Sequence, residues 1–292
     1  MRVLGVPRRP LDRIPATDQI ESDGIFIGLF GMIDPPREEV RGAVALTHIA
    51  GRRGDPYTVL TVAVGIVLTA YLRTGLDIGP DKIQPLALLG FDSSALAVRE
   101  DSPYRTVEDL VEAARASPRS VTFAVGSIGG TGHYFAYQVE RVAGVRFNIV
   151  SMKSGRDAVL AVLGGHVQAT TENLSEMLPQ VEARQLRILG VPAERRVRGV
   201  ADVPTLKEQG FDIRLGSGRG FAAPAGVPRE AAVALEAAFE QVYRSTAWKE
   251  HSARNLFDDV YMSGAEFSRF IAARQPELER YLHEVGLVQK KP

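Results

Sequence analysis

The middle of this chain alternates between short apolar runs and longer segments with one apolar face. The apolar runs are typical of buried strands and fall at 86–89, 95–98, 121–125, 146–150, 166–170 and 186–191. The segments with one apolar face predict helices at 107–116, 134–142, 155–163 and 174–183. Strands that alternate with helices predict an α/β fold with a largely parallel sheet covered by helices.

The pattern changes after residue 215. Residues 216–228 are rich in glycine and proline and predict a segment that crosses between two domains. Three helices are expected after it, at 229–243, 246–255 and 263–285. Pro204 is expected to begin a short helix as well. A middle lobe flanked by parts of another lobe is the layout of a hinged protein that binds its ligand between the lobes.

Two helix starts carry capping boxes, in which a hydroxyl residue stands three positions before a carboxylate. The pairs are Thr106 with Asp109 and Ser263 with Glu266. In each pair, the two side chains can satisfy two backbone N–H groups that the first helical turn leaves without partners. The sequence therefore predicts helix starts at these two places.

The loop after the predicted strand 121–125 is the strongest chemical signal. It contains Gly126, Ser127, Gly129, Gly130 and Thr131, and a predicted helix follows it. Backbone N–H groups at a helix start, together with the positive end of the helix dipole, favour an anion. The loop therefore predicts a site for a carboxylate or phosphate. The alternative is a plain turn in which the glycines only relieve backbone strain.

Known nucleotide and hydrolase motifs do not fit this loop. The phosphate-binding loop of nucleotide hydrolases requires a lysine that is missing here, and Phe135 stands where the dinucleotide motif requires glycine. The nucleophile elbow G-x-S-x-G fails by one position around Ser127. The loop thus argues against a nucleotide enzyme and against a serine hydrolase of that class.

Composition narrows the class further. The chain has 292 residues, 45% of them hydrophobic and 24% charged, as expected for globular domains. Lysine plus arginine and aspartate plus glutamate both number 35, so no basic excess suggests a nucleic-acid partner. Cysteine is absent, and the histidines show no metal-ligand spacing, so no cofactor is expected.

Neither a membrane span nor an export signal is expected. The apolar run 59–72 is shorter than the roughly 20 residues that a spanning helix needs, and it predicts a strand, a break at Gly65 and a helix start. The first ten residues lack the apolar core of a signal peptide. As written, the chain is therefore expected in the cytoplasm.

Several stretches together resemble the substrate-binding proteins of tripartite tricarboxylate transporters, the Bug receptors. The resemblance covers about residues 54–292 and rests on the glycine loop with His133 and on the stretches 101–110, 150–155, 164–168, 202–210 and 220–228. It implies an α/β fold of the periplasmic-binding-protein type II (Venus-flytrap) class with two lobes. It also implies a bacterial periplasmic monomer that is not an enzyme and that captures a small di- or tricarboxylate for a membrane permease.

The resemblance also implies a ligand site. Its members are Gly126, Ser127, Gly129, Gly130, Thr131, His133, Ser154, Gly155, Asn173 and Arg219. The arginine's planar guanidinium could pair a second carboxylate. Three members have alternative roles: His133 as a donor at a helix end, Asn173 as a helix cap, and Arg219 as an exposed charge at the hinge.

Residues 1–52 do not fit this family. The stretch 25–40, with Asp34-Pro-Pro-Arg37, resembles a fragment of P-type cation-transporting ATPases, whose phosphorylated motif is missing here. The family's first strand, loop and helix are absent, so the first lobe is incomplete. A strand at 25–32 and a helix at 37–49 could take their place, with Asp34 near the cleft. The expected domains are a foreign segment at 1–52, lobe 1 at 53–100 and 222–292, and lobe 2 at 101–221.

Two other functions remain open from the sequence. One is a fusion that has lost ligand binding or serves only in interactions, because part of the site is absent. The other is a hydrolase that uses Ser127 or Thr131 with His133. No third group that would orient the histidine is evident in the sequence.

Overall fold

One strand of the computed structural model belongs to two groups of strands. The structure describes residues 38–65, 72 and 78–288, and residues 37–292 form one compact unit. Strand β2 (Ile83–Arg99) covers both apolar runs that the sequence predicts at 86–89 and 95–98. Its first part pairs with β7 (Gly216–Pro224), and its last part pairs with β5 (Ala169–Asn173) and β6 (Leu186–Gly190).

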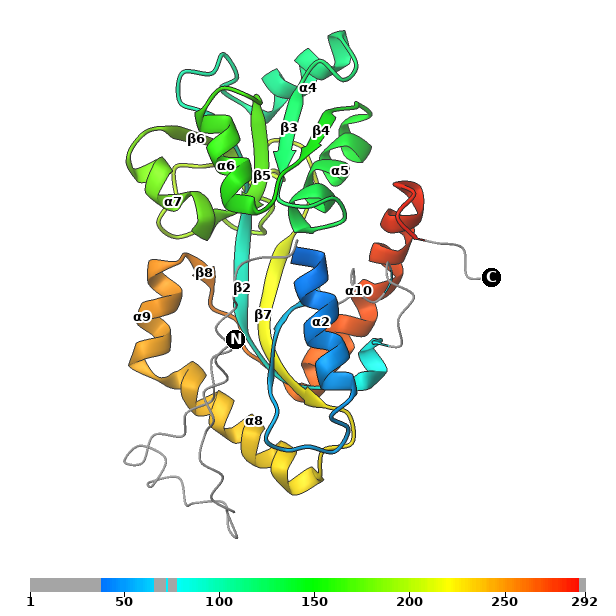
Figure 1. Ribbon diagram of the computed structural model, residues 1–292. Coiled ribbons are helices and arrows are strands. Elements are labelled where there is room, and N and C mark those ends of the chain that lie inside the picture. The colour runs from blue at the N-terminus through cyan, green and yellow to red at the C-terminus, as the bar shows by residue number, and fades with distance from the viewer. Residues whose placement is uncertain (1–37, 66–71, 73–77, 289–292) are drawn as a thin grey trace. The chain divides into compact units, whose positions relative to one another are not determined.

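Strands β2 and β7 run side by side and antiparallel, as Figure 1 shows in cyan and yellow. The register extends from Ile83 opposite Pro224 to Ser93 opposite Gly216. The glycine-rich segment that the sequence expects to cross between lobes is therefore largely a strand. Its small residues suit close packing, because a Cβ on Gly220 would lie 2.5 Å from the Ala87 carbonyl oxygen.

The sheet is mixed, so the prediction of a largely parallel sheet is wrong for much of it. Strands β3 (Thr122–Val125), β4 (Asn148–Ser151) and β5 are parallel neighbours. Strand β2 is antiparallel to every partner, among them β8 (Phe257–Asp258) and β9 (Met262–Ser263). Strand β1 (Leu60–Ala63) is antiparallel to β7. The difference arises because β2 continues from its pairing with β7 into the β3–β4–β5 group, where it is antiparallel to β5.

The helices follow the predicted pattern closely. Their bounds are α4 (Val107–Ala116), α5 (Thr131–Ala143), α6 (Gly155–Leu163), α7 (Leu174–Glu182), α8 (Arg229–Arg244), α9 (Thr246–Arg254) and α10 (Gly264–Glu284). Both predicted capping boxes are present, at the starts of α4 and α10. The 3-10 turn η1 (Pro80–Lys82) precedes β2. Of these described helices, none is long and apolar enough to cross a membrane.

The short helix predicted from Pro204 is wrong. Residues 206–210 form hydrogen-bonded turns instead. Thr205 and Glu208 exchange the same bonds as a capping box, with Glu208 N–H donating to Thr205 Oγ1 at 3.1 Å and Thr205 N–H donating to Glu208 Oε2 at 2.7 Å. Gly210, at φ +91°, follows at once and ends the turn before a helix can extend.

Helix α2 (Glu38–Ala50) confirms the helix expected at 37–49. Its Leu46 and Ile49 are each 1% exposed and belong to the same apolar cluster as Phe267 and Ile271 of α10. The helix is thus built into the core of the compact unit. The predicted strand 25–32 and Asp34 lie outside the described residues.

The burial of Leu46 gives a direct test of whether α2 stabilises the fold. We expect Leu46→Ala to lower the free energy of unfolding by about 2–5 kcal/mol, because it removes packed apolar atoms and leaves a cavity. The matched control is Val44→Ala on the same helix, where the side chain is 62% exposed and a change within about 0.5 kcal/mol is expected. Chemical denaturation measures both variants. Equal stability of the two would show that α2 is not part of the folded core.

Candidate functional site

The glycine loop leaves the start of α5 open. Strand β3 ends at Val125, and α5 begins at Thr131 with Gly130 as a cap that provides no side-chain hydrogen bond. Gly129 has φ +88°, a conformation that favours glycine, and a Cβ on Gly130 would collide with the Ser127 hydroxyl. The backbone at this helix start is therefore not covered by a side chain of its own cap and can approach an anion.

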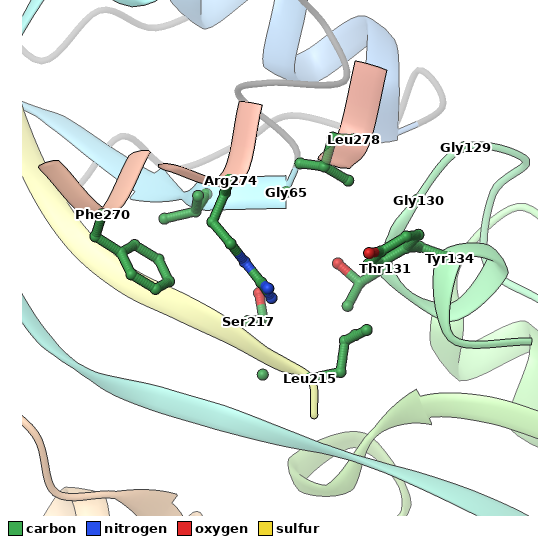
Figure 2. A pocket seen from close by; sticks show the side chains of 12 residues that line it. Gly65, Gly129, Gly130, Thr131, Tyr134, Leu215, Ser217, Phe270, Arg274 and Leu278 are labelled. Carbon is green, nitrogen blue, oxygen red and sulfur yellow. The ribbon is translucent and has the colours of Figure 1, made fainter. Parts of the chain in front are cut away.

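Three of the predicted ligand residues line a pocket. Gly129, Gly130 and Thr131 lie on one wall, and Phe270, Arg274 and Leu278 of α10 lie on the facing wall (Figure 2). The remaining lining residues are Val64, Gly65, Tyr134, Leu215, Gly216 and Ser217. The space between these walls amounts to about 460 Å³ when the open solvent at its mouth is included. The loop backbone, three hydroxyls (Thr131, Tyr134 and Ser217) and one guanidinium thus share a small, otherwise apolar space.

Two other predicted ligand residues, Gly126 and Gly155, lie against the side chain of Glu172. Gly126 N–H donates to Glu172 Oε1 at 2.5 Å, and Glu172 is only 7% exposed. A Cβ on Gly155 would lie 2.8 Å from Glu172 Oε2 and would collide with the carboxylate of Glu176. An internal carboxylate therefore accepts the Gly126 bond that the sequence analysis offered to a ligand. The sequence signal for it was weak, because Glu172 lies two residues beyond the predicted strand 166–170 and among polar neighbours.

Ser154 and Asn173 stand at helix starts. Ser154 Oγ accepts a hydrogen bond from Asp157 N–H at 3.2 Å and caps α6. The Asn173 amide donates weakly to Glu176 at 3.4 Å, and its buried Oδ1 has no partner among the described residues. Neither residue lines the pocket. Their assignment to the ligand site stays a prediction.

Arg219 pairs with a buried aspartate. Its Nη2 lies 2.8 Å from Asp92 Oδ2, which also accepts a hydrogen bond from the Ser175 hydroxyl at 2.9 Å. The Asp92 side chain is 1% exposed and the Arg219 side chain 33% exposed. The pair links the two crossing strands, β2 and β7, and the hydroxyl links both to α7. This contact favours the hinge role for Arg219, which is not among the residues that line the pocket.

His133 holds the glycine loop and contacts α10. Its Nδ1 accepts a hydrogen bond from Gly129 N–H at 3.0 Å and lies 2.5 Å from the Tyr281 hydroxyl. The residue is 8% exposed. An Nδ1 engaged in this way positions the loop, which is close to the predicted alternative of a helix-end role. These contacts give the hydrolase hypothesis no support.

Tyrosines join α5 to α10 beside the pocket. The Tyr134 and Tyr137 hydroxyls donate to Glu277 and Glu284, respectively, and both rings lie within 4.9 Å of the Tyr281 ring, centroid to centroid. Burial and the bond to Glu277 raise the pKa of Tyr134 well above its ordinary value. The Tyr134 side chain therefore stays neutral where it lines the pocket.

Sequence reasoning missed Arg274. Its guanidinium extends from α10 toward Ser217 and Thr131 (Figure 2). The sequence signal was weak, because Arg274 lies among several charged residues in a long amphipathic helix, and only the fold brings that helix opposite the glycine loop. Within the described residues, no cluster of three or more histidine, cysteine or acidic side chains is arranged to hold a metal ion.

Comparison with known families gives one match over most of the chain. The profile described as "Tripartite tricarboxylate transporter family receptor" matches residues 33–287. The match begins upstream of the boundary expected near residue 54 and includes α2. Two relatives are a UPF0065 protein of Cupriavidus necator, 28% identical over 80% of this chain and 72% of its own length, and the protein BugT of Bordetella pertussis, 25% identical over 82% and 74%.

Solved structures share the fold. A TctC solute-binding protein from Polaromonas is 29% identical over 83% of both chains, with a TM-score of 0.70. A Rhodopseudomonas palustris structure with adipate is 23% identical over 84% of this chain and 83% of its own, with a TM-score of 0.75. A second structure from that organism, with malate, is 17% identical over 84% of this chain and 90% of its own, with a TM-score of 0.71. The predicted two-lobed type II binding-protein fold is therefore confirmed.

The resemblance to ATPases is confirmed as a partial match. A calcium-transporting ATPase of Listeria monocytogenes is 33% identical over 122 residues, which cover 41% of this chain but only 13% of the ATPase. The extent of the foreign segment and the lobe boundaries at 100 and 221 stay predictions.

Loss of Arg219 should destabilise the fold. We expect Arg219→Gln to lower the free energy of unfolding by about 3 kcal/mol, because it leaves the buried Asp92 carboxylate without its cation. The exposed Arg195 provides the control variant Arg195→Gln. Adding Asp92→Asn to Arg219→Gln should recover part of the loss, since no buried charge then remains. A double variant less stable than Arg219→Gln would contradict this account of the pair.

The contact between α5 and α10 should weaken at alkaline pH. Burial and the hydrogen bond to Glu284 raise the pKa of Tyr137 from 10.0 to about 12. A raised folded-state pKa stabilises the fold below pH 10, and this contribution is lost as the pH rises to about 12. We expect a steeper fall in unfolding free energy over that range in the wild type than in Tyr137→Phe. Denaturant titrations at several pH values measure the slopes, with Tyr57→Phe, at an exposed site, as the control; equal slopes would refute the assignment.

Proposed function

We propose, because this chain belongs to the tripartite tricarboxylate transporter receptor family, that it is a solute receptor which captures a small carboxylate in the pocket between the glycine loop and α10. The observation that carries this proposal is the uncapped start of α5 in the wall of that pocket. Helix N-termini of this kind bind carboxylates through backbone N–H groups and the helix dipole.

The glycine loop and the residues around it have roles that suit a bound carboxylate. Gly129 and Gly130 bring the backbone close to the ligand, and Thr131 adds a hydroxyl donor at the first position of α5. Apolar side chains such as Leu215 and Leu278 surround these polar groups and limit solvent. A hydrogen bond to a charged acceptor is stronger than a neutral one, and partial exclusion of water strengthens it further.

Two neighbours of the same fold support the carboxylate class, because their structures contain adipate and malate. The identity of the ligand would depend on pocket shape, since backbone donors recognise only the anionic group. We further propose that the receptor works in the periplasm, as a monomer, and delivers its ligand to the membrane permease subunits of the transporter. Capture and delivery involve no catalytic step.

The competing candidate is a fusion that has lost ligand binding. The partial match to ATPases favours it, because a foreign N-terminal segment would replace part of the first lobe's share of the site. Isothermal titration calorimetry with succinate, malate and adipate separates the two. Binding of any of these acids with a dissociation constant in the micromolar range supports the receptor, whereas no heat from any of them supports the fusion.

Binding should depend on the glycine loop. We expect Thr131→Val to weaken binding about tenfold or more, because one hydrogen bond to a charged acceptor contributes about 1.5–3 kcal/mol. Gly129→Val should weaken it further, since φ +88° strains a β-branched residue and displaces the loop. Titration calorimetry with the best acid of the panel measures both variants, and Thr246→Val at the exposed start of α9 is the control. Wild-type affinity in both loop variants would remove this loop from the ligand site.

A further inference from the structure

We propose that Arg274 on α10 is the residue that selects an anionic ligand, by holding a carboxylate on the side of its guanidinium that carries Nε and Nη2. This inference rests on the proposed function and adds a charged partner on the wall that faces the glycine loop. The family comparison and the sequence analysis assign no role to Arg274.

The guanidinium is directed into the pocket. Its Nη1 donates to Glu277 Oε2 at 3.0 Å, which leaves Nε and Nη2 with no hydrogen-bond partner among the described residues. The two N–H groups on that side are parallel and match the two oxygens of a carboxylate. Figure 2 shows the guanidinium extending from α10 toward Ser217, and Thr131 lies on the wall that faces α10. The side chain is 27% exposed, so a ligand can reach it.

Charge in the pocket favours an anion. Among the described residues that line it, Arg274 is the single cation, and none is an aspartate or glutamate. Tyr134 stays neutral because its pKa is raised. An arginine keeps its charge at every pH at which the protein folds. The pocket therefore combines a fixed positive charge with the positive end of α5.

Glu277 fixes where the guanidinium lies. Its Oε2 takes the bond from Arg274, and its Oε1 accepts hydrogen bonds from the Tyr134 hydroxyl and from the Gln138 amide, the latter at 3.4 Å. One carboxylate thus connects the arginine of α10 to two side chains of α5. Glu277 acts as a positioning residue, because it orients Arg274 from outside the pocket lining.

The alternative is that Arg274 only forms an ion pair on its own helix. Such a pair, three residues apart and partly exposed on both sides, contributes little to stability. An arginine with only that role would affect neither the affinity for carboxylates nor the preference for charged over neutral ligands. Removal of the side chain therefore separates the two roles without unfolding the protein.

The test uses Arg274→Gln, Arg274→Lys and the matched control Arg269→Gln, an exposed position on the same helix. Titration calorimetry with succinate and its neutral analogue succinamide measures affinity. We expect Arg274→Gln to bind succinate at least tenfold more weakly than the wild type and to lose the preference for succinate over succinamide. The succinate affinity of Arg274→Lys should lie between those of the wild type and Arg274→Gln, because the charge remains but the planar pair of donors is lost. Wild-type affinity for succinate in Arg274→Gln would overturn the proposal.

A second measurement keeps this inference distinct from the proposed function. If the wild type binds none of the acids, the receptor proposal fails, but Arg274 can still be tested with sulfate. We expect sodium sulfate, compared with sodium chloride at equal ionic strength, to raise the melting temperature of the wild type and of Arg269→Gln more than that of Arg274→Gln. The general salting effect of sulfate is common to all three proteins. An equal rise in all three would overturn the anion site at Arg274.

Discussion

The continuity of β2 is the constraint on which the rest of the structure depends. Its seventeen residues pair with β7 over the first part and with β5 and β6 over the last part, so one rigid ladder carries both groups of strands. The junction buries the Asp92 carboxylate, whose charge needs a partner there. The ion pair between Asp92 and Arg219 meets that need where the two groups join, because a buried carboxylate without a cation would be costly.

The same architecture explains why the proposed anion site is assembled from parts that are distant in sequence. Strand β3 delivers the glycine loop and the start of α5 to one wall, while α10, near the end of the chain, supplies the other wall. The contacts of Tyr134 with Glu277 and of His133 with Tyr281 tie these walls together. The Gly126 N–H at the end of β3 is already used, because it donates to Glu172 Oε1. In the proposed receptor, this internal carboxylate would repel a second anion near α6, which is consistent with a ligand site at Thr131.

Local features of the fold could be predicted, whereas long-range ones could not. The helix starts at Thr106 and Ser263 follow from hydrogen bonds within four residues, and the glycine loop follows from the conformations that only glycine adopts readily. The direction of β2 relative to its partners and the position of Arg274 depend on contacts between residues far apart in the chain, such as Val98 with Ala169 and Tyr134 with Glu277. Arg219 shows the same limit: the sequence offered its guanidinium to a ligand carboxylate, whereas in the structure it pairs with Asp92 of the chain itself.

Helix α2 was expected within a foreign segment, but it is part of this fold and lies inside the range that the receptor profile matches. What the core requires at this place is an apolar stripe, which Leu46 and Ile49 provide at a spacing of three residues. Many amphipathic helices meet that requirement, because apolar residues of about the right size are enough for packing. The ligand site is more demanding, since it needs particular donors at particular places. The origin of the sequence before residue 52 therefore matters less for the stability of the fold than this apolar stripe does, whereas the proposed binding function depends on the pocket residues of β7, α5 and α10.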